Sequence, residues 1–407
     1  MQCRFCKNKL EHIFVDLINA PASNSFLTKE QLNEPESFFP LKLFVCENCK
    51  LVQIDEYKKS NDIFNQDYAY FSSYSTSWLK HAENYVEMIV KKLSLNETSF
   101  VTEIASNDGY LLQYFQEKQI PCIGIEPTFS TASVAKQKGI EVIEDFFNTN
   151  LAKKIKKSDL ILGNNVLAHV PDINDFVKGL KIALKNNGII TMEFPHLLNL
   201  IKENQFDTIY HEHFSYLSLY TLIQIFEKQE LKIFDVEKLP THGGSLRIYA
   251  THIENNDLKT SENVENILNE EKEFGLFDMN IYTIFQEKAN KVKYDLLEFL
   301  LQAKKENKKV VAYGAAAKGN TLLNYAGIKN DLIEFVVDKS PYKQGKFMPA
   351  SHIPIVEEKE IQELKPDYML ILPWNIKDEV IKQLQYVKMW NCKFVTLIPE
   401  LNIKDPI

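Results

Sequence analysis

The stretch TSFVTEIASNDGYLLQYFQEKQIPCIGIEP, residues 98–127, decides the fold class. Its pattern predicts a buried strand, a turn of small residues, a helix with an apolar stripe and a second buried strand. These four elements are expected at 100–104, 105–109, 110–118 and 122–125. Glu126 follows the second strand, and an acidic residue about 20 residues beyond such a turn suits the hydroxyls of a ribose. The stretch therefore predicts a parallel α/β sheet that binds a nucleoside.

The turn indicates which nucleoside is bound. A dinucleotide fingerprint requires G-x-G-x-x-G, but Ala105, Asn107 and Gly109 stand near those positions, so a pyrophosphate would have little room. S-adenosylmethionine (SAM) has no phosphate. Glu103 and Asp108 would repel a pyrophosphate but tolerate a cationic amino-acid tail. The expected SAM-binding residues here are Glu103, Ala105, Asn107, Gly109 and Glu126.

Later segments continue the pattern and carry polar residues where their strands end. In EVIEDFFN (141–148), Asp145 beside Phe146 could hold the exocyclic amine and the ring of an adenine. Buried strands are also expected in DLILGNN (159–165) and GIITMEFPH (188–196), and ligands bind at the carboxyl ends of strands in doubly wound sheets. Each polar residue alone suits an ordinary turn, but their recurrence in register favours a ligand site. The residues at these ends are Asn164, Asn165, His169 and Glu193.

A second Rossmann-like unit is expected at 306–407, joined to the first by a charged helical stretch at roughly 257–305. NKKVVAYGAAAKGNTLLNYAG (307–327) predicts a strand, a glycine turn and a helix. Its glycine spacing resembles a phosphate-binding P-loop, but Asn320 stands where that motif has lysine, so we reject the motif. The small residues still allow a phosphate to approach a helix N-terminus, and Lys318 adds charge. The expected substrate-binding residues are Gly314, Ala315, Lys318, Asn320 and Asp338.

Four of the six cysteines form two Cys-x-x-Cys pairs, Cys3 with Cys6 and Cys46 with Cys49. Two such pairs can supply four thiolates in a tetrahedron, which suits a closed, structural zinc site. The alternative is a redox role for either Cys-x-x-Cys pair. The presence of two such pairs favours the zinc site over redox chemistry. Cys122 and Cys392 stand in apolar, strand-like runs and are expected in the core.

Composition limits the partners and the location. A chain of 407 residues exceeds one compact core, so two or three domains are expected. The net charge is −8 and no basic stripe is apparent, so no nucleic-acid partner is expected. No apolar run approaches the ~18–20 residues that span a bilayer, and no signal-peptide pattern is apparent. We therefore expect a cytoplasmic protein without a membrane partner.

The stretch IYHEHFSYLS (209–218) concentrates groups that can transfer protons among apolar neighbours. Three interpretations are open: proton transfer, a metal site and a surface turn. In a strand, His211 and His213 would share one face and could bind a metal, with His169 or His242 as a third ligand. HGGSLRIY (242–249) is similarly ambiguous, because Arg247 could meet a phosphate or follow a plain hairpin turn.

Taken together, the cysteine pairs and the motifs EIASNDGYLL, NNVLAHVPD, YHEHFSYLS, HGGSLRIY and YGAAAKGNTLLN resemble the SAM-dependent sugar-nucleotide C-methyltransferases. The resemblance covers nearly the whole chain. It implies an α/β protein with a small N-terminal zinc-binding domain, a central Rossmann-like SAM methyltransferase domain and a C-terminal Rossmann-like domain that binds the sugar nucleotide. The expected ranges are 1–66, 67–250 and 251–407.

The resemblance also implies roles for individual residues. Tyr210, Glu212 and His213 match the family's Tyr-x-Glu-His motif, and His169 matches a second histidine near the sugar. The turn 105–109 and Glu126 would hold SAM, and Ala105 replaces a glycine often found there. The stretch YAYFSSYSTSW (68–78) matches a segment that enters the cofactor site. Which of Tyr68, Tyr70 and Tyr74 faces the substrate stays open.

The implied reaction is C-methylation of a nucleotide-linked 4-keto-deoxy sugar, most simply a dTDP-linked sugar at C3. The C3 hydrogen is acidic because it lies next to a carbonyl group, so a base can form an enolate. We expect His213 to be that base, with Glu212 or Tyr210 orienting it or stabilising the enolate, and His169 as its rival. The alternatives are a nicotinamide-dependent sugar-nucleotide oxidoreductase, an O- or N-methyltransferase and a zinc-dependent interaction module.

Overall fold

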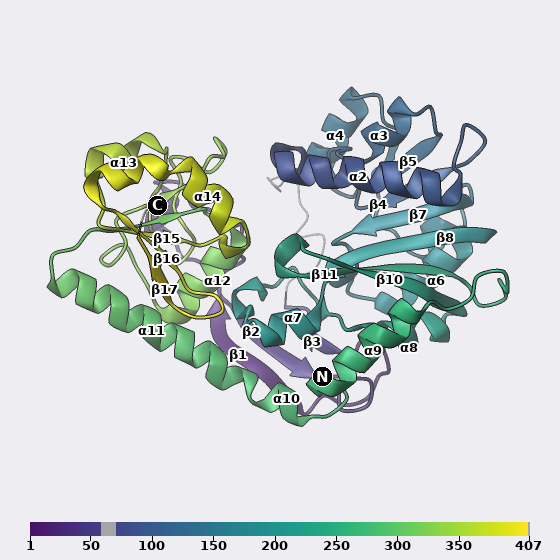
Figure 1. The fold of residues 1–407 in the computed structure, drawn as a ribbon, viewed down its shortest axis with the longest axis horizontal. Coiled ribbons are helices and arrows are strands. Elements are labelled where there is room, and N and C mark those ends of the chain that lie inside the picture. The colour runs from purple at the N-terminus through teal and green to yellow at the C-terminus, as the bar shows by residue number, and fades with distance from the viewer. Residues whose placement is uncertain (58–70, 406–407) are drawn as a thin grey trace.

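Three β-sheets organise the chain in the computed structural model, which describes residues 1–57 and 71–405 (Figure 1). The N-terminal sheet has the order β1-β2-β3-β9 and is antiparallel. Its strands are β1 (His12–Ala20), β2 (Phe39–Val45), β3 (Val52–Ile54) and β9 (Ser215–Tyr216), and a short 3-10 helix, η1 (Gln31–Asn33), lies between β1 and β2. Strand β9 comes from the middle of the chain, so the turn before it is anchored on the N-terminal sheet.

The central sheet has seven strands in the order β10-β11-β8-β7-β4-β5-β6. The strands are β4 (Val101–Ile104), β5 (Cys122–Ile125), β6 (Val142–Ile143), β7 (Ser158–Asn164), β8 (Leu184–Pro195), β10 (Leu231–Leu239) and β11 (Ser245–His252). Strands β4 to β8 pair in parallel, and β11 and β10 extend the sheet antiparallel. From β4 the chain first adds β5 and β6 on one side and then returns to add β7 and β8 on the other. Doubly wound sheets bind ligands at such a reversal of strand order.

Helices cover both faces of the central sheet because its buried strands alternate apolar side chains between the faces. On β7, Leu160 and Leu162 pack toward α2 (Thr76–Leu93), α3 (Leu112–Glu117) and α4 (Phe129–Gln137). Ile161 faces the other side. The helices there are α6 (Ile173–Ala183), α8 (Leu219–Lys228) and α9 (Glu262–Phe274), and the short α5 (Thr149–Ala152) packs on α6.

The C-terminal sheet has the order β14-β13-β12-β15-β16-β17, with all neighbours parallel except β17. Its strands are β12 (Val310–Tyr313), β13 (Val336–Val337), β14 (Ile355–Val356), β15 (Tyr368–Ile371), β16 (Lys393–Thr396) and β17 (Asn402–Lys404). Its helices are α12 (Ala317–Ala326), α13 (Lys359–Leu364), α14 (Lys377–Gln383) and the 3-10 turns η6 (Trp374–Ile376) and η7 (Gln385–Trp390).

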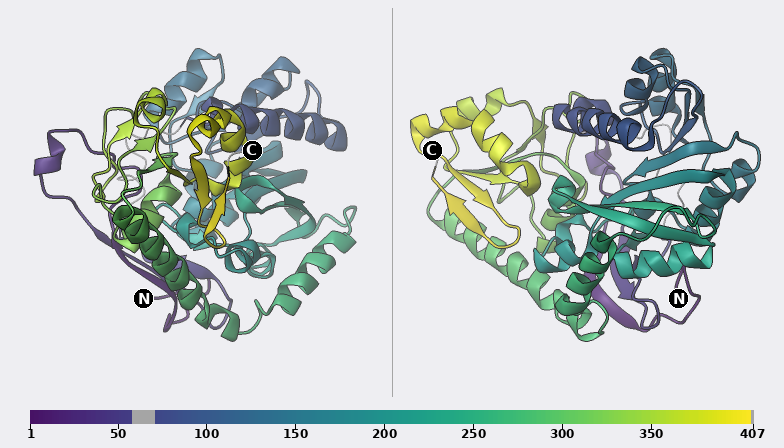
Figure 2. Two further views of the ribbon diagram at one scale, coloured as in Figure 1. Left: turned by 60° about the vertical axis from the view of Figure 1, so that its left-hand side comes forward. Right: turned by 45° about the vertical axis from the view of Figure 1, so that its right-hand side comes forward.

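One hydrophobic core joins the N-terminal sheet to the C-terminal part. The long helix α11 (Phe285–Lys305) follows α10 (Asn280–Thr283) and runs beside β1 and beneath the C-terminal sheet (Figures 1 and 2). Phe14 of β1 stacks on Phe285, with 4.6 Å between ring centroids and 8° between ring planes. The same core takes in α7 (Leu197–Lys202) and η4 (Phe206–Thr208) of the central part. Contacts of this kind fix the three parts relative to one another.

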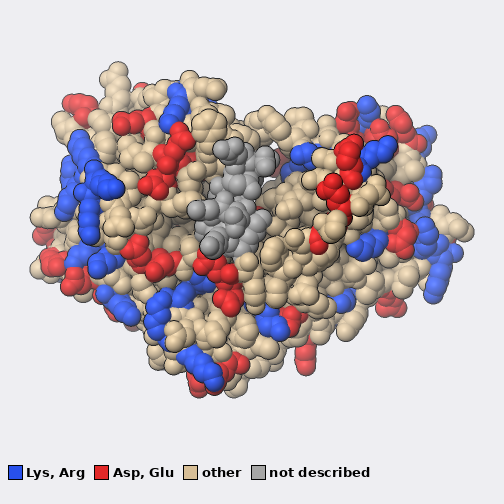
Figure 3. All heavy atoms as spheres, turned by 180° about the vertical axis from the view of Figure 1, so that it is seen from behind, with Lys and Arg blue, Asp and Glu red and all other residues tan. Residues whose placement is uncertain are grey.

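The expected fold class is confirmed. The strand, helix and second strand of the decisive stretch lie at Val101–Ile104, Leu112–Glu117 and Cys122–Ile125, within two residues of the expected bounds. The domain limits stay a prediction, and the limit at 66/67 lies outside the described residues. None of the described helices is both long and apolar enough to cross a membrane. On the face in Figure 3, basic side chains are interspersed with acidic ones.

Candidate active site

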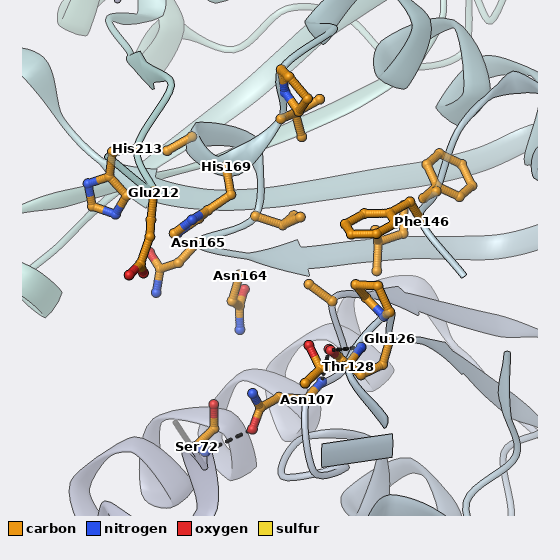
Figure 4. Close-up of a pocket in the computed structure, with 18 of the residues that line it drawn as sticks. Ser72, Asn107, Glu126, Thr128, Phe146, Asn164, Asn165, His169, Glu212 and His213 are labelled. Carbon is orange, nitrogen blue, oxygen red and sulfur yellow. Dashed lines mark hydrogen bonds between the residues drawn. The ribbon is translucent and has the colours of Figure 1, made fainter. Parts of the chain in front are cut away.

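A cavity of about 740 Å³ lies where the three parts of the chain meet. This volume is within the ~300–1,000 Å³ that ligand pockets span. Figure 4 shows His213, His169, Glu212 and Asn165 at one end of it and Glu126, Thr128 and Asn107 at the other. The predicted site residues that line it are Ala105, Asn107, Glu126, Asp145, Phe146, Asn164, Asn165, His169, Tyr210, Glu212, His213 and Lys318.

The turn after β4 has left-handed backbone at three alternate positions. Ala105, Asn107 and Gly109 have φ of 57°, 50° and 73°. Asparagine tolerates this region, and alanine adopts it only at a cost. A Cβ on Gly109 would lie 2.3 Å from the side chain of Ile140, so this glycine serves the packing of the turn and does not line the cavity.

Glu126 fixes the same turn with both carboxylate oxygens. They accept from the backbone N–H groups of Asn107 and Thr128, each at 2.9 Å. Burial raises the pKa of Glu126. The carboxylate lines the cavity, and an acidic residue at this place suits the hydroxyls of a ribose, so this end of the cavity suits an adenosyl group.

Two further carboxyl groups lie behind the turn. Glu103 is fully buried, outside the cavity lining, and burial raises its pKa well above the usual range. Asp108 is also buried and accepts from the hydroxyl and the backbone N–H of Ser73. The side-chain oxygen Oδ1 of the neighbouring Asn107 accepts from the backbone N–H of Ser72 at 2.9 Å (Figure 4). The short helix η2 (Ser72–Tyr74) is thereby fastened over the turn.

The expected adenine and strand-end residues lie at the rim and in the middle of the cavity. Asp145 is exposed, and its carboxylate accepts from the N–H of Phe146 at 2.8 Å. Asn164 donates to the hydroxyl of Tyr110 at 3.2 Å. Tyr74 is exposed and stacks on Tyr342 with 6.4 Å between centroids, whereas Tyr68 and Tyr70 lie outside the described residues.

His213 has a defined tautomer. Its Nδ1 lies 3.1 Å from the carbonyl oxygen of Thr208, which can only accept, so Nδ1 carries the proton and Nε2 keeps its lone pair. The rings of Tyr210 and His169 lie 4.1 Å and 4.7 Å from the His213 ring, measured between centroids. Burial, followed by the neighbouring His169, lowers the pKa of His213 well below its usual value. Burial lowers the pKa of His169 to about 4. Both imidazoles are therefore neutral near pH 7.

Glu212 is directed toward the N-terminal part. Its carboxylate accepts from the amide of Asn24 at 2.9 Å and from the hydroxyl of Ser23 at 3.4 Å. The carbonyl of Thr208, rather than this carboxylate, orients the ring of His213.

The metal alternative for this stretch is wrong. Residues 211 and 212 form a turn, and the strand begins only at Ser215, so the two histidines do not share a strand face. His211 Nε2 lies 3.3 Å and 3.2 Å from the carbonyl oxygens of Phe39 and Pro40, whereas His213 faces Thr208. Among the described residues, the four N-terminal cysteines are the only group with metal-ligand geometry.

The expected substrate residues of the C-terminal part divide into two groups. Lys318 lines the cavity at the start of α12, together with Lys343 from the loop after β13. The others shape this wall from behind it. A Cβ on Gly314 would lie 2.5 Å from Pro373, and Asn320 donates to the carbonyl oxygen of Ser23. Asp338 accepts from the N–H of Ala315 at 2.8 Å, which holds the loop before α12.

Arg247 does not face a phosphate site. Its guanidinium is buried and donates to Glu193 at 2.7 Å and to Glu237 at 3.2 Å. It also lies 4.5 Å above the ring of Tyr85. The carboxylate of Glu193 receives a second bond from His81 at 2.8 Å. Arg247 and Glu193 therefore belong to an internal ion-pair network behind the cavity.

The four N-terminal cysteines converge as expected for zinc. Their Sγ atoms all lie within 4.8 Å of one another, with Cys3 to Cys49 at 3.6 Å and Cys6 to Cys46 at 3.5 Å. A tetrahedral zinc with Zn–S of about 2.3 Å requires S···S distances of roughly 3.8 Å, so the cluster fits this ion. Gln53 donates to Cys3 Sγ at 3.3 Å, which supports a thiolate there. Thr221 of α8 donates to the carbonyl oxygen of Cys49 at 3.0 Å and ties the cluster to the central part.

Several residues that line the cavity were not singled out from the sequence as site residues: Asn24, Trp78, Thr128, His242 and Lys343. Asn24 and Lys343 lie in loops whose patterns carry no ligand signal. Trp78 lies in the segment 68–78 that was expected to enter the cofactor site, and His242 was considered only as a metal ligand. The His-Gly-Gly sequence was the available signal for His242.

Comparison with known proteins assigns the family. Three family models match in succession: "Putative zinc binding domain" at residues 3–64, "Methyltransferase domain" at 78–236 and "C-methyltransferase C-terminal domain" at 240–399. The C-methyltransferase NovU of Streptomyces niveus is 31% identical over 403 residues, which cover 98% of this chain and 96% of NovU. This chain belongs to the SAM-dependent C-methyltransferase family. The C-methyltransferase uses SAM and holds zinc through its four N-terminal cysteines, and the oxidoreductase alternative is dropped.

Two solved structures align with part of the C-methyltransferase. A SAM-dependent methyltransferase from Clostridium acetobutylicum is 12% identical, with 43% of this chain and 92% of that chain covered and a TM-score of 0.35. Magnesium protoporphyrin IX methyltransferase from Synechocystis, solved with bound SAH, is 14% identical, with 43% and 83% covered and a TM-score of 0.35.

Proposed function

We propose that this C-methyltransferase acts on a nucleotide-linked 4-keto-deoxy sugar, with a dTDP-linked sugar methylated at C3 as the expected substrate. The observation that carries the proposal is the order of groups along this cavity. The SAM turn and Glu126 lie at one end, the neutral histidines His169 and His213 lie beyond them, and the cationic start of α12 forms a further wall. A keto sugar nucleotide presents an acidic carbon and a diphosphate in one molecule, which suits this order.

The wall at α12 supports binding of a diphosphate. Ala316, Ala317 and Lys318 line the cavity where the helix begins, and the N-terminus of a helix attracts anions through its free N–H groups and its dipole. Lys343 adds a second ammonium group, which is held by the carbonyl oxygen of Ala315 at 2.8 Å and by the carboxylate of Asp338 at 3.4 Å. A carboxylate substrate would use the same charges, so the sugar nucleotide has to be tested directly.

The histidine pair supports proton removal from carbon. Nε2 of His213 has a free lone pair because Nδ1 is protonated against Thr208. In the proposed step the C3–H bond breaks, the proton joins Nε2 and the electron pair moves through C3–C4 onto the carbonyl oxygen. SAM, when bound, supplies a methyl group on a positively charged sulfur. His169 stays the rival base, because its ring is held in the same way, by the backbone of Glu212.

Carbon NMR with methyl-¹³C SAM tests the proposal. The purified enzyme is incubated with keto sugar nucleotides that carry dTDP, UDP or GDP, and with matched sugars reduced to a 4-hydroxyl. We expect a carbon-bound methyl signal from a keto sugar and no signal from its reduced counterpart. A methoxy signal would contradict the enolate mechanism. SAM binding without transfer to any keto sugar would contradict the substrate class.

A further inference from the structure

The turn 242–244 is wedged between the central and C-terminal parts of the chain. Its residues His242, Gly243 and Gly244 have φ of 53°, 86° and 113°, all in the left-handed half of the map. A Cβ on Gly243 would lie 2.4 Å from the ring of Trp374, and one on Gly244 would lie 2.2 Å from the amide nitrogen of Asn199. Both positions therefore require glycine. A plain hairpin turn needs no such packing. The close packing of Gly243 and Gly244 fixes the position of the adjacent His242.

The imidazole of His242 lines the cavity and has one nitrogen fixed. Its Nε2 lies 3.0 Å from the side-chain amide nitrogen of Asn165, and its ring meets Trp78 edge-on with 5.1 Å between centroids. An amide nitrogen only donates, so Nε2 accepts and Nδ1 carries the ring proton. Asn165 is itself held, because its backbone N–H donates to the carbonyl oxygen of Glu193 at 2.7 Å. Within residues 1–57 and 71–405, no protein acceptor is found for this Nδ1–H.

We propose that His242 is a further catalytic residue, whose Nδ1–H donates to the carbonyl oxygen of the keto substrate as the enolate forms, and that Asn165 positions it by fixing the tautomer. The inference rests on the proposed function, because it names the group that donates a hydrogen bond to the enolate oxygen of the keto substrate. The proton stays on Nδ1 and no bond at the imidazole breaks.

Two observations explain why such a donor is needed at this place. His213 is a weak base, since burial and then His169 lower its pKa, and the ring of His242 lines the same cavity. A weak base removes a proton from carbon only if the developing oxyanion is stabilised. Burial lowers the pKa of His242 to about 4, so its ring is a neutral donor near pH 7.

Deuterium exchange isolates this step from methyl transfer. The keto sugar nucleotide that the enzyme methylates is incubated in D₂O with S-adenosylhomocysteine, and loss of the C3–H signal is followed by proton NMR. His242→Ala removes the imidazole and leaves no side-chain donor, whereas asparagine would keep an amide N–H. We expect exchange to slow by about 10²–10³-fold, the usual effect of removing one oxyanion donor. His352→Ala is the matched control, because His352 has φ of 55°, close to the 53° of His242, and pairs with Glu36 outside the cavity. Its exchange rate should equal that of the unmodified enzyme.

Asn165→Asp tests the role of the His242 tautomer, because the aspartate side chain has nearly the same shape as that of asparagine. A carboxylate only accepts, so Nε2 must then carry the proton, and Nδ1 keeps one only while the ring is an imidazolium. Exchange by this variant should therefore fall, relative to the unmodified enzyme, as pH rises through the raised pKa of His242. The other charged groups that act on this ring, Lys318, Glu193 and His81, are the same in both enzymes. A merely structural role for Asn165 predicts a ratio of rates that is constant with pH.

The possible results separate the two proposals. Exchange at the unmodified rate in His242→Ala would overturn the role of His242, and a ratio for Asn165→Asp that does not change with pH would overturn the role of the tautomer. If the unmodified enzyme binds SAM but neither exchanges nor methylates any keto sugar nucleotide, the proposed function fails and this inference fails with it.

Discussion

The side-chain amide of Asn24 donates to the carboxylate of Glu212 across 2.9 Å, and so joins a loop of the zinc-binding part to the turn that carries His213. The loop is held from its other side, because Asn320 of α12 donates to the carbonyl oxygen of Ser23. The N-terminal part is therefore one wall of the active site as well as a metal-binding unit.

Replacing Asn24 with alanine should slow methyl transfer by about ten- to a hundredfold in kcat/KM. Hydrogen bonds to charged groups contribute about 1.5–3 kcal/mol, and each 1.36 kcal/mol corresponds to a factor of ten. Steady-state kinetics with labelled SAM measure the effect, and zinc content should stay unchanged. Asn33→Ala, in the exposed turn η1, is the control. Equal values of kcat/KM for the two variants would show that the Asn24 contact does not contribute to methyl transfer.

His213→Asn should lower kcat by about 10²–10⁴-fold, which is the usual contribution of a general base. SAM affinity, measured by calorimetry, should be unchanged because His213 and Glu126 lie at opposite ends of the residues shown in Figure 4. His252→Asn, on β11 outside the cavity, is the control. Normal turnover by His213→Asn together with an inactive His169→Asn would move the base to His169.

The sequence predicts local structure well where the residues that determine an element lie in the same segment as that element. The stretch 98–127 carries its own strand pattern, its turn residues and Glu126, so the sheet and the carboxyl-end position of that side chain follow from it. The cysteine pairs are similar, since tetrahedral geometry requires four ligands and the chain offers two matched pairs.

Contacts between distant segments could not be predicted in the same way. Asn320 was expected to bind substrate, but it holds the Ser23 carbonyl, 297 positions away in the sequence. Arg247 was open to a phosphate role, and its partner Glu193 becomes a neighbour only when β11 pairs with β8. No periodicity in the chain encodes either pairing, because both depend on how the sheets and helices dock.

Cys46→Ser should lose zinc and lower the melting temperature, because one thiolate of the tetrahedron is replaced by a hydroxyl. The loss should also weaken SAM binding, since Cys49 is tied to α8 through Thr221 and the cysteines share a core with the central sheet. Elemental analysis and thermal unfolding measure both effects. Cys122→Ser, a half-buried thiol outside the cluster, should retain its zinc. A zinc-free Cys46→Ser protein with normal stability would contradict a structural role for the metal.

Glu103→Gln should stabilise the protein more at pH 8 than at pH 5. Burial raises the pKa of Glu103 well above its unfolded value of about 4.3, so the folded state retains a proton that the unfolded state has released. The folded state then binds more protons, and the free energy of unfolding of the unmodified protein falls as pH rises above the unfolded pKa. Glutamine is neutral and removes this loss. Thermal unfolding should show a difference in melting temperature that grows with pH, at ~2–4 °C for each 1 kcal/mol. Glu141→Gln, at an exposed position near β6, should show no such trend. A constant difference for Glu103→Gln would mean that Glu103 is ionised in the folded protein.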